Sequence, residues 1–528
     1  MFFYVFCFEI VKMTISNIQY LDNLSTNIEK QLCYKLSTIE VDIMTTETSL
    51  RAQFDSLRER FIQQSGVPLK ERKKILRHFL KSIRKEQAAI IEALSSDFGG
   101  RSSFETLGAE ILIVTEGIKH ILRNLDDWVE IRHPETSWLF WPAKCEERYQ
   151  PLGVVGIISP WNYPVQLTLM PIVEAVAAGN FIMLKPSEFT PNTSRLLFDM
   201  ISSIMGDKCV VIEGDGSVGA EFSTLPFDHL FFTGSTKIGR LVMKAAAENL
   251  TPVTLELGGK SPVIIHESFS LKRAAQRICF GKFYSAGQTC IAPDYILCPK
   301  GKMSELLQLI QEEVSRLYPT LEDNDDYTAV INDRREQSLQ NLLDDAKEKG
   351  ATISQINPAS ETLNKKFAPT IVTNVTDDML IMQEEIFGPI LPIVEIDTID
   401  DAIAYVNARP RPLALYYFDT KQKRIDAVLT QTHSGGVCIN ETILHVGQHN
   451  LGFGGVGASG MGRYHGKDGF ETFLGLDEAN TKIQLLYSFW EGVQFSVSRE
   501  SYNRTFASSV KFRLARQSKS FPFNIVGY

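Results

Sequence analysis

The sequence predicts an α/β fold built on a doubly wound, mainly parallel sheet. Short apolar runs alternate with longer segments of helical character in the middle of the chain. The runs lie at 152–158, 181–184, 210–212 and 229–232, with helices expected at 166–178, at 191–205 and up to Ala247. Such alternation is typical of strands joined in parallel by crossing helices. Ligands of such sheets bind at the carboxyl ends of the strands.

The composition is that of a large globular protein with an acidic excess. The chain has 528 residues, of which 44% are hydrophobic and 22% charged, so it is long enough for two or more domains. The net charge is -9, from 54 basic and 63 acidic residues. A nucleic acid is therefore not expected as the main partner, because phosphate binding needs a basic excess.

Eight cysteines are scattered over the chain, with no CxxC pair and no Cys/His cluster of zinc-ligand spacing. We therefore expect reduced thiols, no metal site and a cytoplasmic location. No apolar run reaches the roughly 18 residues that a membrane-spanning helix needs. The apolar N-terminus is interrupted by Glu9 and does not resemble a signal peptide.

The residues before the alternating region have a different character. Residues 1–48 show no clear period and form an extension without an assigned structure. Residues 131–150 are rich in aromatics and proline, which favours an extended arm or a hairpin. Between these segments, helices are expected at 50–64, from Pro68 to the Gly99-Gly100 pair, and at 104–130.

A second α/β block is expected to begin near Val253. Its strands are expected at 262–265, 294–298, 388–394 and 413–418, and its helices at 270–283, 302–317, 333–348 and 400–408. Residues 447–462 are rich in glycine and indicate a loop region. The segment from 481 to 528 is basic without a clear period, and no fold is assigned to it.

Cys290 has a setting unlike that of the other cysteines. It ends the stretch Gly287-Gln-Thr-Cys290 and is followed closely by Pro293. A thiol at such a position could attack a carbonyl carbon while its own backbone N–H stabilises the oxyanion. Taken alone, a buried structural cysteine is the commoner case.

Two polar residues at strand ends are candidates to assist this thiol. Glu256 ends an apolar run, where its carboxylate could activate water or accept the thiol proton. Asn162, in Pro160-Trp-Asn-Tyr-Pro164, could donate its amide to the oxyanion. The alternatives are a surface glutamate at a strand end and a turn-forming asparagine.

A nucleotide site is indicated after two further strands. The turn Gly234-Ser-Thr-Lys-Ile-Gly239 follows a strand and opens a helix, as phosphate-binding turns do. It lacks the full G-x-G-x-x-G pattern. Lys185 and Glu188 follow a neighbouring strand, where they could bind ribose hydroxyls, with ordinary surface charge as the alternative.

These residues belong to ordered motifs that resemble the aldehyde dehydrogenases over residues of about 50 to 475. The motifs are Pro160-Trp-Asn-Tyr-Pro164, Lys185-Pro-Ser-Glu188, Phe232-Thr-Gly-Ser235, Leu255-Glu-Leu-Gly-Gly-Lys260, Gly287-Gln-Thr-Cys290 and Glu384-Glu-Ile-Phe-Gly-Pro389. The ending 454–467 is similar to the class 3 branch, which includes fatty and aromatic aldehyde enzymes. Within that branch, residues 407–418 and 432–437 look most like coniferyl aldehyde dehydrogenases.

The resemblance implies a role for each candidate residue. Cys290 would be the nucleophile, Glu256 the general base and Asn162 the oxyanion donor. The cofactor would be NAD or NADP. The adenosine ribose would contact Lys185 and Glu188, the pyrophosphate Gly234, Ser235 and Gly239, and the nicotinamide half Glu385 and Phe387.

The resemblance also implies the domain organisation. Residues 49–255 would bind the cofactor, residues 256–446 would form the catalytic domain, and 447–480 would return to the first domain. The arm at 131–150 and a strand near residue 470 would form an oligomerisation hairpin, so a homodimer is expected. Beyond Phe473 the resemblance stops. Residues 481–528 are therefore a divergent tail, and residues 1–48 also lie outside the match.

The function that follows is oxidation of an aldehyde to its acid, with coniferaldehyde or a medium- or long-chain alkanal as substrate. Glu188 favours NAD, because a carboxylate near the ribose 2′-oxygen repels a 2′-phosphate. Two alternatives remain: a coenzyme A-acylating enzyme, disfavoured by Glu256, and a nucleotide-binding protein without catalysis. Aromatic side chains that could line an apolar tunnel, with core packing as the alternative, are Trp161, Tyr163, Tyr284 and Phe453.

Overall fold

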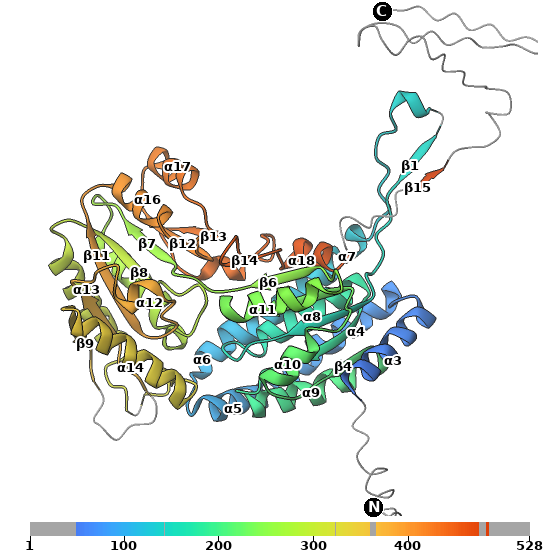
Figure 1. Cartoon of the computed structure of the whole chain (residues 1–528), viewed down its shortest axis with the longest axis horizontal. Coiled ribbons are helices and arrows are strands. Elements are labelled where there is room, and N and C mark those ends of the chain that lie inside the picture. Colours follow the sequence, from blue (N-terminus) through green and yellow to red (C-terminus); the bar gives the residue numbers. More distant parts are fainter. Residues whose placement is uncertain (1–48, 142, 323, 359–365, 475–481, 485–528) are drawn as a thin grey trace, which may run out of the picture.

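The computed structural model describes residues 49–141, 143–322, 324–358, 366–474 and 482–484. Two lobes, each built around a sheet, lie side by side, and a thin hairpin extends away from them (Figure 1). The predicted N-terminal extension and most of the predicted tail lie outside the described residues. No helix in the described part of the chain combines the length and apolar character that crossing a membrane requires.

The first lobe contains a six-stranded sheet in the order β14-β6-β5-β2-β3-β4. Its strands are β2 (Val154–Ile158), β3 (Phe181–Lys185), β4 (Cys209–Val211), β5 (His229–Thr233), β6 (Val253–Glu256) and β14 (Gly460–Met461). All neighbouring pairs are parallel except β14, which runs antiparallel to β6. From β2 the chain winds outward through β3 and β4 and then, in the other direction, through β5 and β6. The predicted doubly wound sheet is confirmed.

Helices cover this sheet. The connecting helices are α8 (Gln166–Ala178), α9 (Pro191–Met205), α10 (Gly216–Phe222) and α11 (Thr236–Ala247). The N-terminal helices are α3 (Leu50–Gln64), α4 (Leu69–Lys85) and α5 (Gln87–Phe98). Every residue of α8 is buried, because α8 packs between the sheet and α4, α7 and α18.

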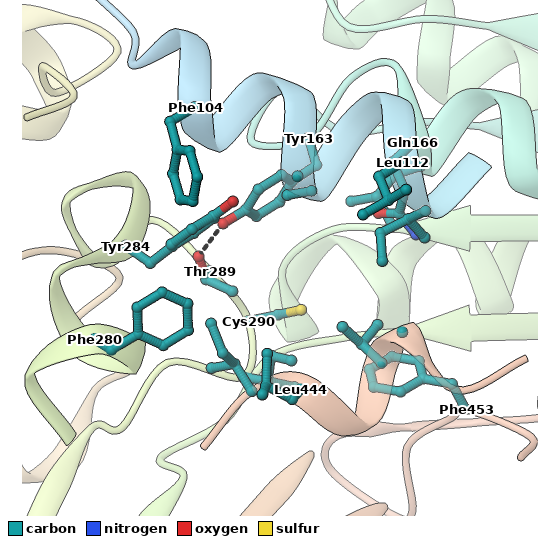
Figure 2. Close-up of a pocket in the computed structure, with 18 of the residues that line it drawn as sticks. Phe104, Leu112, Tyr163, Gln166, Phe280, Tyr284, Thr289, Cys290, Leu444 and Phe453 are labelled. Carbon is teal, nitrogen blue, oxygen red and sulfur yellow. Dashed lines mark hydrogen bonds between the residues drawn. The ribbon is translucent and has the colours of Figure 1, made fainter. Parts of the chain in front are cut away.

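The helix expected at 104–130 is interrupted. It consists of α6 (Ser103–Glu105), a π-helical segment η2 (Thr106–Leu112) and α7 (Ile113–Trp128). Segments of π-helix occur frequently at functional sites, and η2 lies over the cavity described below (Figure 2).

The second lobe contains a seven-stranded sheet in the order β13-β12-β7-β8-β11-β10-β9, parallel except for β9. Its strands are β7 (Pro262–Ile265), β8 (Tyr295–Pro299), β9 (Thr352–Gln355), β10 (Thr370–Thr373), β11 (Ile390–Ile396), β12 (Ala414–Phe418) and β13 (Gly436–Ile439). Its helices are α12 (Leu271–Phe283), α13 (Met303–Leu317), α14 (Asp333–Glu348), α15 (Leu380–Gln383), α16 (Ile399–Asn407) and α17 (Gln422–Gln431). Sequence analysis missed β9, β10, β13, α15 and α17. The three strands are only four residues long and carry little apolar pattern.

The strand at Val253 belongs to the first sheet, which corrects the expectation that it opens the second block. Here β6 pairs in parallel with β5, and Glu256 lies opposite Thr233. An apolar run of four residues does not reveal which sheet it joins. This pairing brings Glu256 to the same sheet edge as the turn after β5.

Residues 131–150 form the predicted hairpin, with an antiparallel bridge between Arg132 and Glu147. The prediction of a strand near residue 470 is wrong, because the helix α18 (Gly466–Thr472) occupies this position. Its Phe470 is fully buried, with its ring 5.4 Å from that of Trp128. The partner of β1 (Lys144–Glu146) in the hairpin is instead β15 (Lys482–Gln484), in the segment to which sequence analysis assigned no fold.

Candidate active site

The parallel sheet of the first lobe brings several predicted site residues to one edge. Lys185 ends β3, Asn162 follows β2, Gly234 follows β5 and Glu256 ends β6. These four strands are consecutive neighbours and point the same way. The chain winding reverses between β2 and β5, the kind of position where α/β sheets bind ligands.

Cys290 follows a turn with an unusual backbone, η5 (Tyr284–Gly287), between α12 and β8. Ser285, Ala286 and Gly287 have φ values of 53°, 50° and 72°, a region that non-glycine residues rarely adopt. A Cβ on Gly287 would come within 2.3 Å of the Gly388 carbonyl oxygen. The glycine before the cysteine is therefore required by close packing as well as by its backbone angle.

Buried hydrogen bonds hold this turn in place. The side-chain amide of Gln288 is fully buried and donates to the carbonyls of Ser285 and Ala329, each at 3.0 Å. Its oxygen accepts the N–H of Ile331 at 3.0 Å. These bonds tie the cysteine loop to the second lobe, which limits its motion.

Asn162 lies directly against the cysteine loop and is only 4% exposed. Its Nδ2 donates to the carbonyl of Gln288 at 3.2 Å, and its own carbonyl accepts from Arg101 at 2.7 Å. The residues that follow Asn162 and Gln288, Tyr163 and Thr289, are also in contact: their hydroxyl oxygens lie 2.6 Å apart (Figure 2). An amide carries two N–H bonds, and the bond to Gln288 uses one of them.

The Cys290 thiol is held in its neutral form by its surroundings. Burial raises its pKa, and the nearby carboxylates of Glu385 and Glu256 raise it further. The backbone N–H groups of Cys290 and Ile291 act in the opposite direction, because they stabilise negative charge at the sulfur. The thiol therefore needs a proton acceptor before it can act as a nucleophile.

Glu256 is a buried carboxyl group, 3% exposed. Neither of its side-chain oxygens has a hydrogen-bond partner within the described ranges. Burial raises its pKa well above the ordinary value, and the charge of Glu174 raises it further. A carboxylate with raised proton affinity is suited to general-base catalysis near neutral pH.

Glu385 and Phe387 reach this site from the second lobe. The Glu385 carboxylate lies so close to Gly258 that a Cβ there would be 2.0 Å from it. Burial raises the pKa of Glu385 to about 8, with Asp294 adding to the effect, and Oε1 has no hydrogen-bond partner in the described part of the chain. The ring of Phe387 packs edge-on against Trp161 at 5.4 Å.

The remaining cofactor candidates lie along the edge of the first sheet. Lys185 is buried and its Nζ lies 3.2 Å from Glu188 Oε2. Ser235 caps α11 by accepting the N–H of Ile238 at 3.4 Å. Gly239 lies one turn into α11, where a Cβ would meet Leu257 at 2.6 Å. Close packing of α11 against Leu257 therefore requires a glycine at this position.

An apolar cavity of about 300 Å³ leads to Cys290. Figure 2 shows the sulfur pointing into this space, with aromatic and aliphatic side chains around it. Of the four aromatic residues for which a tunnel role was left open, Tyr163, Tyr284 and Phe453 line this cavity and Trp161 does not. Trp161 instead packs between Phe98 and Phe387. The other large side chains at the cavity include Phe104, Leu112, Gln166, Phe280, Leu444 and Tyr464.

Sequence analysis missed several buried polar residues around the site. Glu174 is fully buried in α8, near Glu256, and Tyr464 is 1% exposed at the cavity wall. Arg101, Glu105 and Glu110 are also buried. The signal for Glu174 was available, since it is the one charged residue in the apolar helix 166–178. The others lie in polar surroundings that offered no such contrast.

A half-buried thiol with backbone donors, a neighbouring buried carboxyl group and a glycine turn at the strand edge are the features expected of an oxidoreductase that works through a cysteine. The sequence model of the aldehyde dehydrogenase family matches residues 38–478. The chain belongs to this family, and the match begins within the N-terminal segment that was expected to lie outside it. The family's reaction is the NAD(P)-dependent oxidation of an aldehyde. A second model, DUF5777, matches residues 461–528, most of which lie outside the described residues.

Individual relatives support the same assignment. A probable coniferyl aldehyde dehydrogenase of Pseudomonas aeruginosa is 49% identical over 425 residues, covering 80% of this chain and 89% of the relative. The substrate-bound Staphylococcus aureus AldH has a TM-score of 0.77 and 39% identity, covering 81% of this chain and 92% of the other. A Mycobacterium tuberculosis aldehyde dehydrogenase complexed with NAD+ has a TM-score of 0.73 and 28% identity, covering 80% and 87%.

Proposed function

We propose that the protein oxidises apolar aldehydes, with aromatic aldehydes such as coniferaldehyde as the principal class. The observation that carries this proposal is the apolar, aromatic-lined cavity of about 300 Å³ that leads to Cys290. In such a cavity, a planar aromatic substrate gains binding free energy by stacking against aromatic rings and by leaving water. The similarity to a probable coniferyl aldehyde dehydrogenase supports the choice. Medium- and long-chain alkanals are the second candidates.

In the proposed mechanism, the Cys290 thiol passes its proton to water, and the thiolate sulfur forms a bond to the aldehyde carbon. Asn162 Nδ2 and the Cys290 N–H hold the resulting oxyanion. A hydride leaves the same carbon as the C=O bond re-forms, which gives a thioester. Glu256 then takes a proton from water, whose oxygen attacks the thioester carbon. The thiolate leaves and the carboxylic acid is released.

The proposed cofactor site comprises Lys185, Glu188, Gly234, Ser235, Gly239, Glu385 and Phe387. The buried, unpartnered Oε1 of Glu385 fits a ribose hydroxyl, which would supply the missing donor. Bound NAD would supply the acceptor for the hydride. Residues 49–255 would form the binding domain, 256–446 the catalytic domain, and 447–480 would return to the first. We expect NAD to be preferred, and a higher kcat/KM with NADP would contradict the role given to Glu188.

We propose further that the protein is a cytoplasmic homodimer formed through the hairpin at 131–150. The supporting observation is an apolar tip, where Trp138 and Trp141 are 77% and 76% exposed. Large exposed apolar patches mark interaction sites. Light scattering coupled to size exclusion gives the test: the wild type should be a dimer and a Trp138→Ser/Trp141→Ser variant a monomer.

The central test is a Cys290→Ala variant assayed by aldehyde-dependent absorbance at 340 nm. We expect activity of the wild type with coniferaldehyde to exceed that with decanal, and no activity of the variant with either. A variant that still reduced NAD would remove Cys290 from the mechanism. Formation of an acyl-coenzyme A product, in place of the free acid, would favour the acylating alternative, against which Glu256 argues. A wild type that binds NAD but oxidises no aldehyde would favour a nucleotide-binding role without catalysis.

A further inference from the structure

We propose that Glu105 is a positioning residue for the loop that carries Cys290. Its buried carboxylate accepts the backbone N–H of Ser285 and thereby holds the strained turn in the conformation that presents the thiol. The inference rests on the proposed role of Cys290 as nucleophile. Glu105 lies 180 positions before Ser285 in the chain, at the end of α6, where the helix becomes π-helical.

Glu105 contacts the turn through both its side chain and its backbone. Its Oε1 accepts the Ser285 N–H at 2.8 Å. Its main-chain carbonyl accepts the hydroxyl of Tyr284 at 3.1 Å. The first two residues of the turn are therefore fixed by one residue of another segment.

The contact falls where the backbone is least relaxed. Ser285 is the first of three consecutive residues with positive φ, and it is fully buried. Such backbone conformations persist only where the surroundings hold them. A buried N–H without an acceptor is unfavourable. Without Glu105, the turn would therefore lower its free energy by rearranging. A rearranged turn would move Cys290, which lies five residues further along the chain.

The carboxylate itself is anchored from the opposite side. Oε2 accepts the Thr328 hydroxyl at 2.5 Å, and Thr328 Oγ1 accepts the N–H of Ser102 at 3.1 Å. The next residue, Ala329, accepts from Gln288 at 3.0 Å. These bonds close a ring that runs from Glu105 through the second lobe to the cysteine loop and back.

The same short segment also holds the loop of the proposed oxyanion donor. Arg101 donates to the Asn162 carbonyl at 2.7 Å and lies 3.3 Å from Glu110. Glu110 Oε2 accepts the N–H groups of Val165 and Gln166 at 3.0 and 2.8 Å. Residues 101–110 therefore reach both the asparagine loop and the cysteine loop, and set their relative position.

The position is an unfavourable one for a carboxyl group. Glu105 is 3% exposed, and burial raises its pKa to about 7, although Thr328 and Ser285 act in the opposite direction. An apolar side chain would avoid this unfavourable burial. The residue is explained by the acceptor that it provides at Ser285.

The test compares Glu105→Met with Glu105→Gln in the full chain. Methionine has a similar length but offers Ser285 no comparable acceptor. Glutamine keeps an oxygen for Ser285, and its N–H₂ can donate to Thr328. We expect Glu105→Met to lower kcat about 10- to 100-fold, because small misplacements of reacting groups have effects of this size. The KM for NAD should stay unchanged. Glu105→Gln should keep kcat within about threefold of the wild type, a loss smaller than the loss of about tenfold or more expected for Glu105→Met.

A matched variant, Thr328→Val, separates the contact to Ser285 from general disturbance of the network. It removes the anchor of Glu105 but leaves the acceptor at Ser285, so we expect a smaller loss of kcat, about threefold to tenfold, which is about 0.6–1.4 kcal/mol in the barrier. If Glu105→Met does not fold, an unchanged kcat in Thr328→Val overturns the proposal.

Two results with Glu105→Met also overturn it: full kcat with only a lower melting temperature, or a loss that Glu105→Gln shares. The Cys290→Ala variant, measured in parallel, distinguishes failure of the positioning role of Glu105 from failure of the proposed function. If Cys290→Ala is inactive and Glu105→Met retains full kcat, the positioning role alone is refuted. If Cys290→Ala is active, the proposed function is refuted first.

Discussion

The two sides of Cys290 differ in the kind of interaction that forms them: hydrogen bonds between polar groups on one side, apolar contacts on the other. On one side, buried polar groups with fixed partners tie the asparagine loop to the cysteine loop, as with Asn162 and Gln288 at 3.2 Å. On the other side, the cavity is apolar, and some of its lining is open to solvent, with Phe104 67% and Leu444 51% exposed. Directional bonds allow one geometry only, whereas apolar contacts depend on shape and area. The chemistry should therefore be sensitive to single changes, and the choice of aldehyde tolerant of them.

The largest effect is expected at the buried carboxyl group of Glu256. Replacing Glu256 with glutamine should slow thioester hydrolysis by about 10²–10⁴-fold, the range for loss of general-base catalysis. The initial burst of reduced cofactor should survive, because it precedes hydrolysis. Rapid-mixing absorbance at 340 nm measures both phases. A variant with normal steady-state turnover would show that another group activates the water.

The pH dependence of the same step follows from the raised pKa of Glu256. Below that pKa the group is protonated and cannot act as a base, so the hydrolysis rate of the wild type should rise as the pH rises through it. Glu256→Gln should lack this rise. A profile that is equally steep in both proteins would assign the titration to a different group.

The next largest effect is expected at Asn162, one of the hydrogen-bonded polar groups beside Cys290. Asn162→Ala should lower kcat about 10²–10³-fold, as for the loss of one oxyanion donor. The melting temperature should fall only slightly, because the lost bond to Gln288 is one of several in this region. A loss of less than threefold would mean that the backbone N–H of Cys290 suffices for the oxyanion.

The smallest effect is expected at the mouth of the cavity. Leu444→Ala should lower kcat/KM for the preferred aldehyde by about 2- to 10-fold, since a half-exposed leucine contributes only part of its about 1.5–3 kcal/mol of apolar burial. Leu451→Ala is the matched control, because Leu451 is 59% exposed but does not line the cavity. Equal losses in both variants would remove Leu444 from substrate selection.

Sequence reasoning was most successful where the signal was local. The strand-helix alternation predicted four of the six strands of the first sheet, and the helices α8, α9 and α11, because periodicity depends on neighbouring residues. It failed at residue 470, where α18 replaces the expected strand, because Phe470 is buried against Trp128, some 340 positions earlier. It left two roles open for Trp161, the tunnel wall and core packing, and the side chain packs against Phe98 and Phe387.

The sequence by itself determined the candidates for chemistry: Cys290 after its glycine turn, and polar residues at the ends of apolar strands. These signals are local, since a glycine, a strand end or a motif is visible in a few neighbouring letters. Only the tertiary structure decided which acidic residues are buried. Nothing in the local sequence distinguishes Glu105 and Glu110 from exposed glutamates, and they are buried because segments far along the chain pack against them. The same packing places their carboxylates on the backbone of the two loops that meet at Cys290.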